Sequence, residues 1–311
     1  MMNNLKNTLW PQSLVDSILN WSKTYSIPGF NEVPVYNIVG FIIKELKADD
    51  ITTRANSVAF NFFISLFPFI IFILPLIAQL PFVDDFWSNL QSSMDGVIPE
   101  SARTYIIEII SGIRNDGQYG IQSLGFILAV IFSSSGMINL MYGFDKSYAL
   151  SFKSRNYFHK RIIAIGLTLL VGILFILSVA FIILGKEILG PIFGDNALAS
   201  IGFNVLRWII LLISFYSVIT LIYRYGTSLY RPLKLINPGA ILATGLSIIS
   251  SVLFSYFIDN FGRYNEIYGS IGALIVILLW LQINAFVLLV GFELNASIAV
   301  NRDLLEKPQA R

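Results

Sequence analysis

Six apolar stretches, each long enough or nearly long enough to cross a bilayer as a helix, constrain this chain more than any other feature. The hydrocarbon core of a membrane is about 30 Å thick, and about 20 helical residues are needed to cross it. Charged residues make up only 13% of the 311 residues, whereas a soluble domain typically has about 25%. The stretches are Val58–Leu80, Ile121–Phe144, Ile162–Leu184, Trp208–Tyr225, Ala240–Phe257 and Ile271–Glu293. The sequence therefore predicts an all-α membrane protein, a bundle of six transmembrane helices.

Positive charge alternates between successive loops and predicts the orientation of the chain. All but five of the 21 Lys and Arg residues lie before the first stretch, in the second-to-third and fourth-to-fifth loops, and in the tail. Because basic residues accumulate in cytoplasmic loops, we expect both termini to be cytoplasmic. The first 35 residues hold no continuous apolar run typical of a signal peptide. We therefore expect a multi-pass protein of the cytoplasmic (inner) membrane that inserts by its internal spans.

The regions outside the spans are expected to form three further parts. The N-terminal region, 1–53, is expected to be cytoplasmic and contains YNIVGFIIKELKADD at 36–50. Its apolar side chains lie mainly on one helical face, which predicts an amphipathic helix on the inner membrane surface or packed on the bundle. They are Ile38, Phe41, Ile42 and Leu46. The acidic loop 81–120 is expected to be extracytoplasmic and helical, 54–295 to form the membrane domain, and 296–311 to form a cytoplasmic tail.

Residues that could carry catalysis or bind a metal are few. The chain has no cysteine and one histidine, His159, which excludes thiolate and multi-histidine metal centres. It contains no GxSxG, HExxH or P-loop pattern. The net charge of +2 is too small to indicate a nucleic-acid binder. We therefore expect no catalytic residue, no metal, no cofactor and no nucleic-acid partner.

The first stretch carries polar side chains and two prolines along one helical stripe. Steps of three or four residues connect its members, which are Arg54, Ser57, Asn61, Ser65, Pro68, Phe72, Pro75 and Gln79. Because lipid offers no partner for polar groups, we expect this stripe to face the protein interior. Two interpretations stay open. The stripe either joins helices through amides and hydroxyls, or it lines a cavity with Arg54, Asn61, Ser65 and Pro68.

Small residues mark two other stretches. The segment Ser133–Gly136 lies in the middle of the second stretch. It is typical either of close helix packing or of a broken helix that exposes backbone groups to a substrate, with Ser134 and Gly136 as candidates. In the fifth stretch, small side chains recur at every fourth position from Gly239 to Ser255. This pattern predicts a helix-packing seam.

Polar residues also mark the cytoplasmic ends of the fifth and sixth stretches. Asn237 and Pro238 predict a helix start, because asparagine caps helices and proline fits the first turn. Glu293 lies near the end of an otherwise apolar helix, and an ionisable residue there is a functional candidate. The alternative is that Glu293 reaches interfacial water or pairs with a basic residue such as Arg54 or Arg224.

A basic segment, KSRNYFHKRI at 153–162, precedes the third stretch. Cationic side chains on the cytoplasmic side of a span attract anionic lipid headgroups. The candidates are Arg155, His159, Lys160 and Arg161. We interpret His159 as a side chain at headgroup level rather than as a catalyst.

Several short segments occur in an order that resembles a known family. They are SLFPF at 65–69, SSSG at 133–136 followed by DKSY at 145–148, Arg155 and Arg161 spaced as R-x5-R, PGA at 238–240, YGSIGA at 268–273, Trp280, and GFEL at 291–294. Together they resemble the YihY/BrkB family of six-span bacterial inner-membrane proteins. One departure is that the family commonly shows an N-x-x-Y pattern where this chain has Asp145 to Tyr148.

The resemblance implies a multipass cytoplasmic-membrane protein whose activity is not settled. Members of the family have been linked to virulence, to the handling of envelope lipid or lipopolysaccharide, and to export. An older label, ribonuclease BN, named the family a transfer-RNA-processing enzyme. A soluble polyanion would need a basic surface and a metal or acid-base constellation. The short cytoplasmic loops of this chain argue against that activity.

We therefore expect a transporter-like or lipid-handling protein of the bacterial envelope. Candidate residues for its cavity or substrate are Arg54, Asn61, Ser65, Pro68, Ser134, Gly136, Asp145 and Glu293. Its expected partners are membrane lipids and an unknown small-molecule or lipid substrate, and a homo-oligomer is left open. One alternative is a structural or scaffold membrane protein that acts through its outer loop. A ribonuclease, as in the older family label, is the less favoured alternative.

Overall fold

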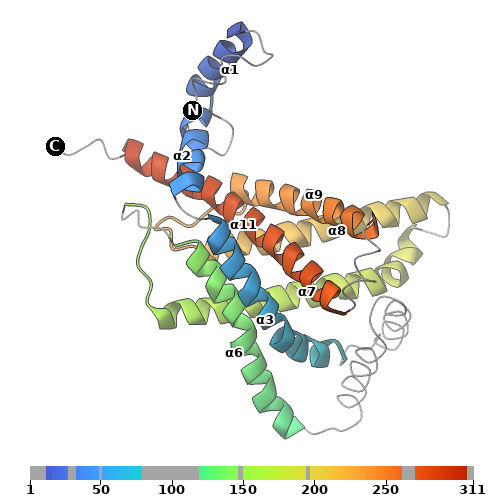
Figure 1. Ribbon diagram of the computed structural model, residues 1–311. Helices are drawn as coiled ribbons and strands as arrows, with labels where there is room; N and C mark the ends of the chain where they lie inside the picture. The colour runs from blue at the N-terminus through green and yellow to red at the C-terminus, as the bar shows by residue number, and fades with distance from the viewer. Residues whose placement is uncertain are drawn as a thin grey trace.

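The computed structural model describes seven segments of the chain, and most of their residues are helical (Figure 1). The segments are 12–26, 33–48, 51–78, 119–145, 150–193, 197–260 and 270–306. The helices are α1 (Gln12–Thr24), α2 (Val35–Ala48), α3 (Ile51–Ala78), α6 (Tyr119–Gly143), α7 (Tyr157–Phe193), α8 (Ala197–Leu221), the π-helical turn η2 (Ile222–Gly226), α9 (Pro238–Asn260) and α11 (Ser270–Glu306). The predicted outer loop, 81–120, lies almost entirely outside the described residues.

Five helices in the described part of the chain are long and apolar enough to cross a membrane. Their apolar segments are Phe126–Gly143, Tyr157–Ser178, Trp208–Gly226, Pro238–Phe257 and Leu274–Leu304. These segments correspond to the second to sixth predicted spans. The first predicted span lies on α3, a helix of 28 residues that is not among the five. The structure therefore shows an all-helical protein with five candidate spans, and a sixth span on α3 stays a prediction.

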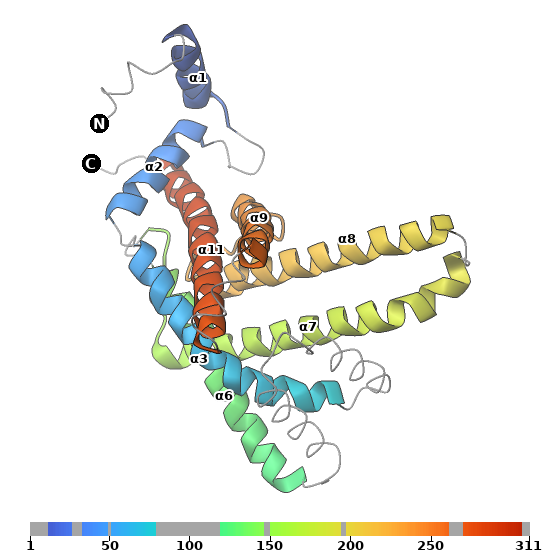
Figure 2. The same cartoon turned by 45° about the vertical axis from the view of Figure 1, so that its right-hand side comes forward.

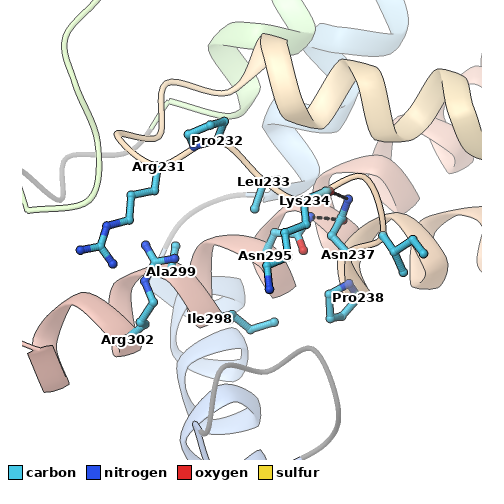
Figure 3. Close-up of a pocket in the computed structure, with 11 residues that line it drawn as sticks. Arg231, Pro232, Leu233, Lys234, Asn237, Pro238, Asn295, Ile298, Ala299 and Arg302 are labelled. Atoms are coloured by element: carbon cyan, nitrogen blue, oxygen red, sulfur yellow. Dashed lines mark hydrogen bonds between the residues drawn. The ribbon is translucent and has the colours of Figure 1, made fainter.

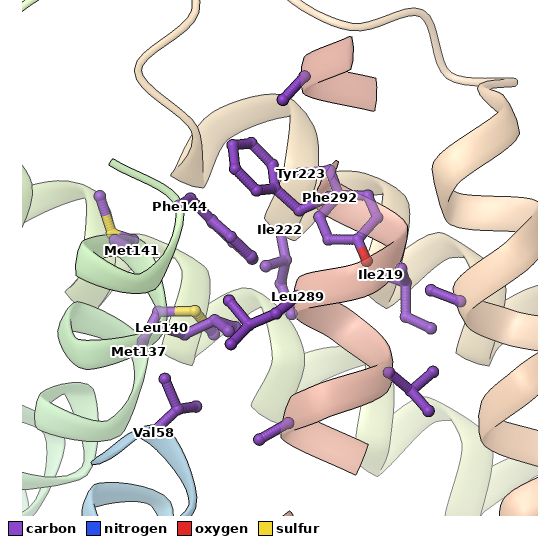
Figure 4. Close-up of a cluster of buried hydrophobic side chains, with 14 of the residues drawn as sticks. Val58, Met137, Leu140, Met141, Phe144, Ile219, Ile222, Tyr223, Leu289 and Phe292 are labelled. Atoms are coloured by element: carbon purple, nitrogen blue, oxygen red, sulfur yellow. The ribbon is translucent and has the colours of Figure 1, made fainter. Parts of the chain in front are cut away.

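A buried core joins α3, α6, η2 and α11 (Figure 4). Phe144, Tyr223 and Phe292 are fully buried at its centre. The Phe144 ring lies 4.7 Å from the Phe292 ring and 5.6 Å from the Tyr223 ring, measured between centroids. The Tyr223 hydroxyl also donates a hydrogen bond to the Leu288 carbonyl oxygen, at 2.6 Å. This aromatic cluster fixes the relative positions of the helix ends that carry the polar residues described below.

Two glycines let α9 and α11 cross closely. A side-chain carbon at Gly239 would clash with the Gly291 carbonyl oxygen, and one at Gly291 would lie 2.7 Å from the Gly239 carbonyl oxygen. Ala243 and Ser247, one and two turns further along α9, are also buried. The predicted packing seam is therefore present over the first half of α9, whereas Ser255 in its second half is exposed.

The α7–α8 hairpin extends away from the other helices (Figure 2). Large apolar side chains along it are strongly exposed, among them Leu177 at 59% and Trp208 at 71%. In a protein with several spans, such side chains are expected to face lipid rather than water. This observation fits the apolar composition of the third predicted span.

The helix α2 packs against the C-terminal part of α11. Val33 and Ile38 from the N-terminal side contact Leu294 and Ile298 in one buried cluster. Of the two predicted positions for the amphipathic segment, the described contacts place it on the bundle. The helix α11 itself continues through Glu306, into the region that was predicted to form the cytoplasmic tail.

The broken helix considered for the second span is not observed. The helix α6 is continuous through Ser133, Ser134, Ser135 and Gly136. The hydroxyls of Ser133 and Ser134 donate to the carbonyl oxygens of Val130 and Ile131, one turn earlier, at 3.0 Å and 2.7 Å. Serine side chains that bond back to their own helix leave the backbone ladder intact, so no backbone group is freed here.

Candidate functional site

An ion pair joins α3 to α11 inside the bundle. Arg54 Nη2 donates to Glu293 Oε1 at 2.9 Å, and Arg54 Nη1 donates to the Gly143 carbonyl oxygen, at the end of α6, at 2.7 Å. The Glu293 side chain is fully buried, whereas that of Arg54 is 19% exposed. Of the two basic partners considered for Glu293, the structure selects Arg54. One guanidinium thus connects three helices.

The burial of Glu293 explains why breaking the Arg54–Glu293 pair would cost much free energy. Every residue from 291 to 300 on α11 is buried, on all faces of the helix. A buried carboxylate is costly unless it is paired and hydrogen-bonded. Removing one partner of such a pair typically costs about 3–5 kcal/mol, because the remaining charge is left uncompensated. Arg54 and Glu293 therefore act as one unit.

Of the remaining candidates on α3, Ser65 lies against α6. Ser65 is buried, and Gly136 of α6 lies so close to Ser65 and Phe62 that a methyl group at position 136 would clash with both side chains. Asn61 is half-buried, and its amide donates to the Ser57 carbonyl oxygen at 2.8 Å. Pro68 is also half-buried. In the described geometry, Ser65 and Gly136 join two helices, and this favours packing over a cavity wall at this point.

A second arginine reaches α6 from α7. Arg161 Nη1 lies 3.1 Å from Ser134 Oγ and 3.3 Å from Ser135 Oγ. Ser134, one of the predicted cavity residues, therefore accepts a charge-assisted hydrogen bond from a predicted headgroup residue. The structure brings these two separately predicted sets together.

The ion pair between Asp145 and Lys160 fixes the start of α7 to the end of α6. The Lys160 ammonium contacts Asp145 Oδ2 and lies 4.5 Å from the centre of the Tyr142 ring. Asp145 Oδ1 also lies 3.4 Å from Ser228 Oγ, in the α8–α9 loop. The Asp145 carboxylate, at the end of α6, therefore accepts from two other segments, α7 and the α8–α9 loop.

Arg155 binds backbone carbonyl groups at the π-helical turn. Its Nη1 donates to the carbonyl oxygen of Tyr225 at 2.9 Å and lies 3.4 Å from that of Gly226. A π-helical turn interrupts the regular backbone ladder, and Arg155 supplies a donor to the carbonyl groups there. Burial lowers the pKa of Arg155, and the nearby charge of Asp145 opposes that shift.

His159 differs from the other predicted headgroup residues because its side chain is exposed. Its backbone N–H donates to Asn156 Oδ1 at 2.9 Å. Asn156 directly precedes α7 and caps its first turn. His159 lies one turn into the helix, at the surface, whereas Arg155, Lys160 and Arg161 bind groups of the protein itself.

A cavity of about 130 Å³ lies between the α8–α9 loop and α11 (Figure 3). Arg231, Lys234 and Arg302 contribute the charged groups of its wall. Asn237 and Asn295 lie beside Lys234, at the end away from the two arginines (Figure 3), and Asn295 Nδ2 donates to Asn237 Oδ1 at 2.8 Å. Within the described residues, no three His, Cys, Asp or Glu side chains come together as metal ligands would.

The sequence predicts Asn237 as a helix cap, and the structure confirms this role. Asn237 Oδ1 accepts the Ala240 N–H at 2.8 Å. The sequence did not link it to Asn295, whose Oδ1 accepts the Gly239 N–H at 3.0 Å. The cationic cavity beside these amides was also missed, since its three charges come from a loop and a helix end about 70 residues apart.

Comparisons with known proteins give a consistent result. The family model described as virulence factor BrkB matches residues 42–311. The putative ribonuclease-like protein YfkH of Bacillus subtilis is 28% identical over 256 residues, which cover 81% of this chain and 91% of that protein. A UPF0761 membrane protein of Aeromonas salmonicida is 24% identical, over 83% of this chain and 87% of its own length. One of Pseudoalteromonas atlantica is 23% identical, over 86% and 88%. No solved structure matches the chain significantly.

Proposed function

Because the chain belongs to the virulence factor BrkB family and is a multi-pass membrane protein, we propose that it moves or remodels an anionic amphiphile of the envelope. The Arg54–Glu293 pair carries this proposal. It joins α3 to α11 among buried residues, where ionised side chains are rare and usually functional. A purely structural contact could have been made by apolar side chains at lower desolvation cost.

In the proposed mechanism, the ion pair is a latch between helices. A guanidinium has five N–H donors, so Arg54 can bind a second anion while Glu293 stays paired with it. An anionic headgroup that reaches Arg54 would compete with Glu293 for these donors and weaken the contact between α3 and α11. The Arg54 side chain is 19% exposed, so an anion can reach it from the surface of the protein. The Glu293 side chain is fully buried.

Lipid exchange in vesicles tests this proposal. Purified protein is placed in vesicles of phosphatidylethanolamine and phosphatidylglycerol that contain a fluorescent phosphatidylglycerol, and the fraction of dye accessible to an external quencher is followed over time. We expect the wild type to speed the exchange of dye between leaflets. The double variant Arg54→Gln/Glu293→Gln should fall towards the rate of protein-free vesicles.

The double variant is preferred because it removes both charges and leaves neither one unpaired. Thr168→Ala is a matched control: Thr168 is a buried polar residue on α7 whose hydroxyl bonds only within its own helix, to Ala164. Its exchange rate should match that of the wild type. If the double variant folds and exchanges lipid as fast as the wild type, the latch is not part of the function.

A further inference from the structure

We propose that the cavity between the α8–α9 loop and α11 binds a single phosphate group, such as that of an anionic lipid headgroup. This site is separate from the Arg54–Glu293 latch, and the inference does not rest on the proposed lipid exchange. It rests on the size of the cavity, the charge of its wall, and the way in which the loop is held in place.

The cavity suits one small ligand group. Its volume is about 130 Å³, well below the roughly 300–1,000 Å³ of pockets that enclose whole drug-sized molecules. It is also larger than the roughly 10–15 Å³ that a cavity needs to hold one water molecule. A phosphate group with its ester oxygens falls within this range, and the rest of a lipid would have to remain outside.

The wall of the cavity is cationic, and two of its cations are anchored by carboxylates. Arg231 Nη2 lies 2.8 Å from Glu306 Oε2, and Arg302 Nη2 lies 2.8 Å from Asp303 Oδ1. A guanidinium has five N–H donors, so each arginine keeps donors for a ligand while the carboxylate holds it in place. Planar arginine forks match the oxygens of a phosphate group.

Lys234 adds a third positive charge to the wall. Its side chain is exposed, and no carboxylate of the described residues pairs with it. The three cations therefore outnumber the two carboxylates that anchor the arginines. An anion that entered the cavity would meet a net positive charge.

Dedicated hydrogen bonds hold the loop in its conformation. The Leu233 carbonyl oxygen accepts from Arg224, the Lys234 carbonyl oxygen from Asn237, and the Leu235 carbonyl oxygen from Tyr216. Three consecutive carbonyl groups of a segment without regular structure thus bind side chains. A loop held in this way is organised before a ligand arrives, and this lowers the entropy cost of binding.

The two buried asparagines position the loop rather than contact the ligand. Asn237 Oδ1 accepts from Ala240 N and from Asn295 Nδ2, and Asn295 Oδ1 accepts from Gly239 N. Both amide oxygens therefore accept from backbone N–H groups at the start of α9, and Asn295 Nδ2 also donates to Asn237 Oδ1. Figure 3 shows these amides at one end of the cavity and the two arginines at the other.

Apolar side chains beside the cavity favour a lipid as the source of the phosphate group. Leu235 and Ile236 follow Lys234 directly and are 59% and 76% exposed. An exposed apolar pair next to cationic side chains is typical of a segment that lies at the membrane interface. A headgroup at this depth would have its phosphate beside Lys234 and its acyl chains beside the two apolar residues.

The first arm of the test measures lipid binding. The protein is purified in neutral detergent with equimolar phosphatidylglycerol and phosphatidylcholine, and retained lipid is counted by native mass spectrometry. We expect phosphatidylglycerol to be retained in preference. Lys234→Gln and Arg302→Gln should each lower its retention about tenfold, in line with the loss of one charge-assisted contact. The Lys234 variant breaks no internal bond, so it reports on binding even if Arg302→Gln fails to fold.

The Arg231–Glu306 ion pair makes the test specific, because changes at its two residues should have opposite effects on lipid binding. Arg231→Gln should weaken binding, whereas Glu306→Gln should strengthen it severalfold, because it removes the carboxylate that competes with the ligand. A purely structural pair would give two losses. Lys153→Gln removes an exposed charge from the α6–α7 loop, outside the cavity, and should leave retention unchanged.

The second arm replaces the lipid with inorganic phosphate, measured by calorimetry in the same detergent. Phosphate binding that depends on Lys234 and Arg302, without lipid preference, would support the site and assign it to a soluble phosphate. If neither probe binds, or if the cavity variants bind like the wild type, the inference is overturned. The Arg54→Gln/Glu293→Gln variant should still bind, which separates this result from failure of the latch.

Discussion

Two arginine–glutamate pairs in this molecule have nearly the same geometry and opposite surroundings. The nitrogen–oxygen distance is 2.9 Å in Arg54–Glu293 and 2.8 Å in Arg231–Glu306. Glu293 is fully buried, whereas the side chains of Arg231 and Glu306 are 59% and 48% exposed. Contact distance therefore says little about the role of a pair. Burial decides how much free energy is lost when one partner of the pair is removed.

The largest expected effect comes from leaving one buried charge alone. Glu293→Gln should lower the free energy of unfolding by about 3–5 kcal/mol, because it breaks an ion pair whose carboxylate is fully buried. The double variant Arg54→Gln/Glu293→Gln should recover most of that loss. Chemical denaturation in detergent, followed by circular dichroism, measures both values. Equal losses in the single and double variants would contradict the coupling between the two residues.

A smaller effect is expected at the helix seam beside the buried pair. Gly239→Ala should cost about 1–3 kcal/mol, the usual range for overpacking, because the added methyl group would clash with the backbone of α11. Gly245, two turns further along α9, has no atom within 4 Å of an added methyl group. Gly245→Ala should be neutral or stabilising, and a thermal melt of the two variants compares them directly.

The exposed pair should respond least, and its response should depend on pH. The hydrogen bond from Arg231 lowers the pKa of Glu306. The pair therefore contributes its stabilisation above the ordinary glutamate pKa, and this contribution is lost as the pH falls through the lowered pKa. Because both groups are exposed, salt should screen the contribution. Arg231→Gln should give a melting temperature within error of the wild type at neutral pH; a marked drop would show that the pair is structural.

Local signals in the sequence were enough to predict several features of the fold. Apolar length predicted the five candidate spans that the described helices contain, because bilayer thickness sets helix length. The Asn237-Pro238 start of α9 was predicted because a cap depends on neighbours three residues away. The spacing of small residues predicted the seam that Gly239 and Ala243 form with α11.

Long-range pairings could not be predicted in the same way. Glu293 had two basic candidates, and only the packing of α3 on α6 and α11 places Arg54 beside it. The three serines before Gly136 were compatible with a break or with packing, since the sequence does not show where their hydroxyls bond. The partner of Asn295 is 58 residues away, and no local pattern connects the two.

The helix α11 links the two proposed sites mechanically, because one continuous helix carries a residue of each. It is one uninterrupted helix of 37 residues, or about 55 Å, and it carries both Glu293 and Arg302. These residues are nine positions apart, about 14 Å along the axis at 1.5 Å per residue. When a rigid helix slides along its axis, every residue on it moves by the same distance. An axial slide of α11 would therefore displace Glu293 and Arg302 together.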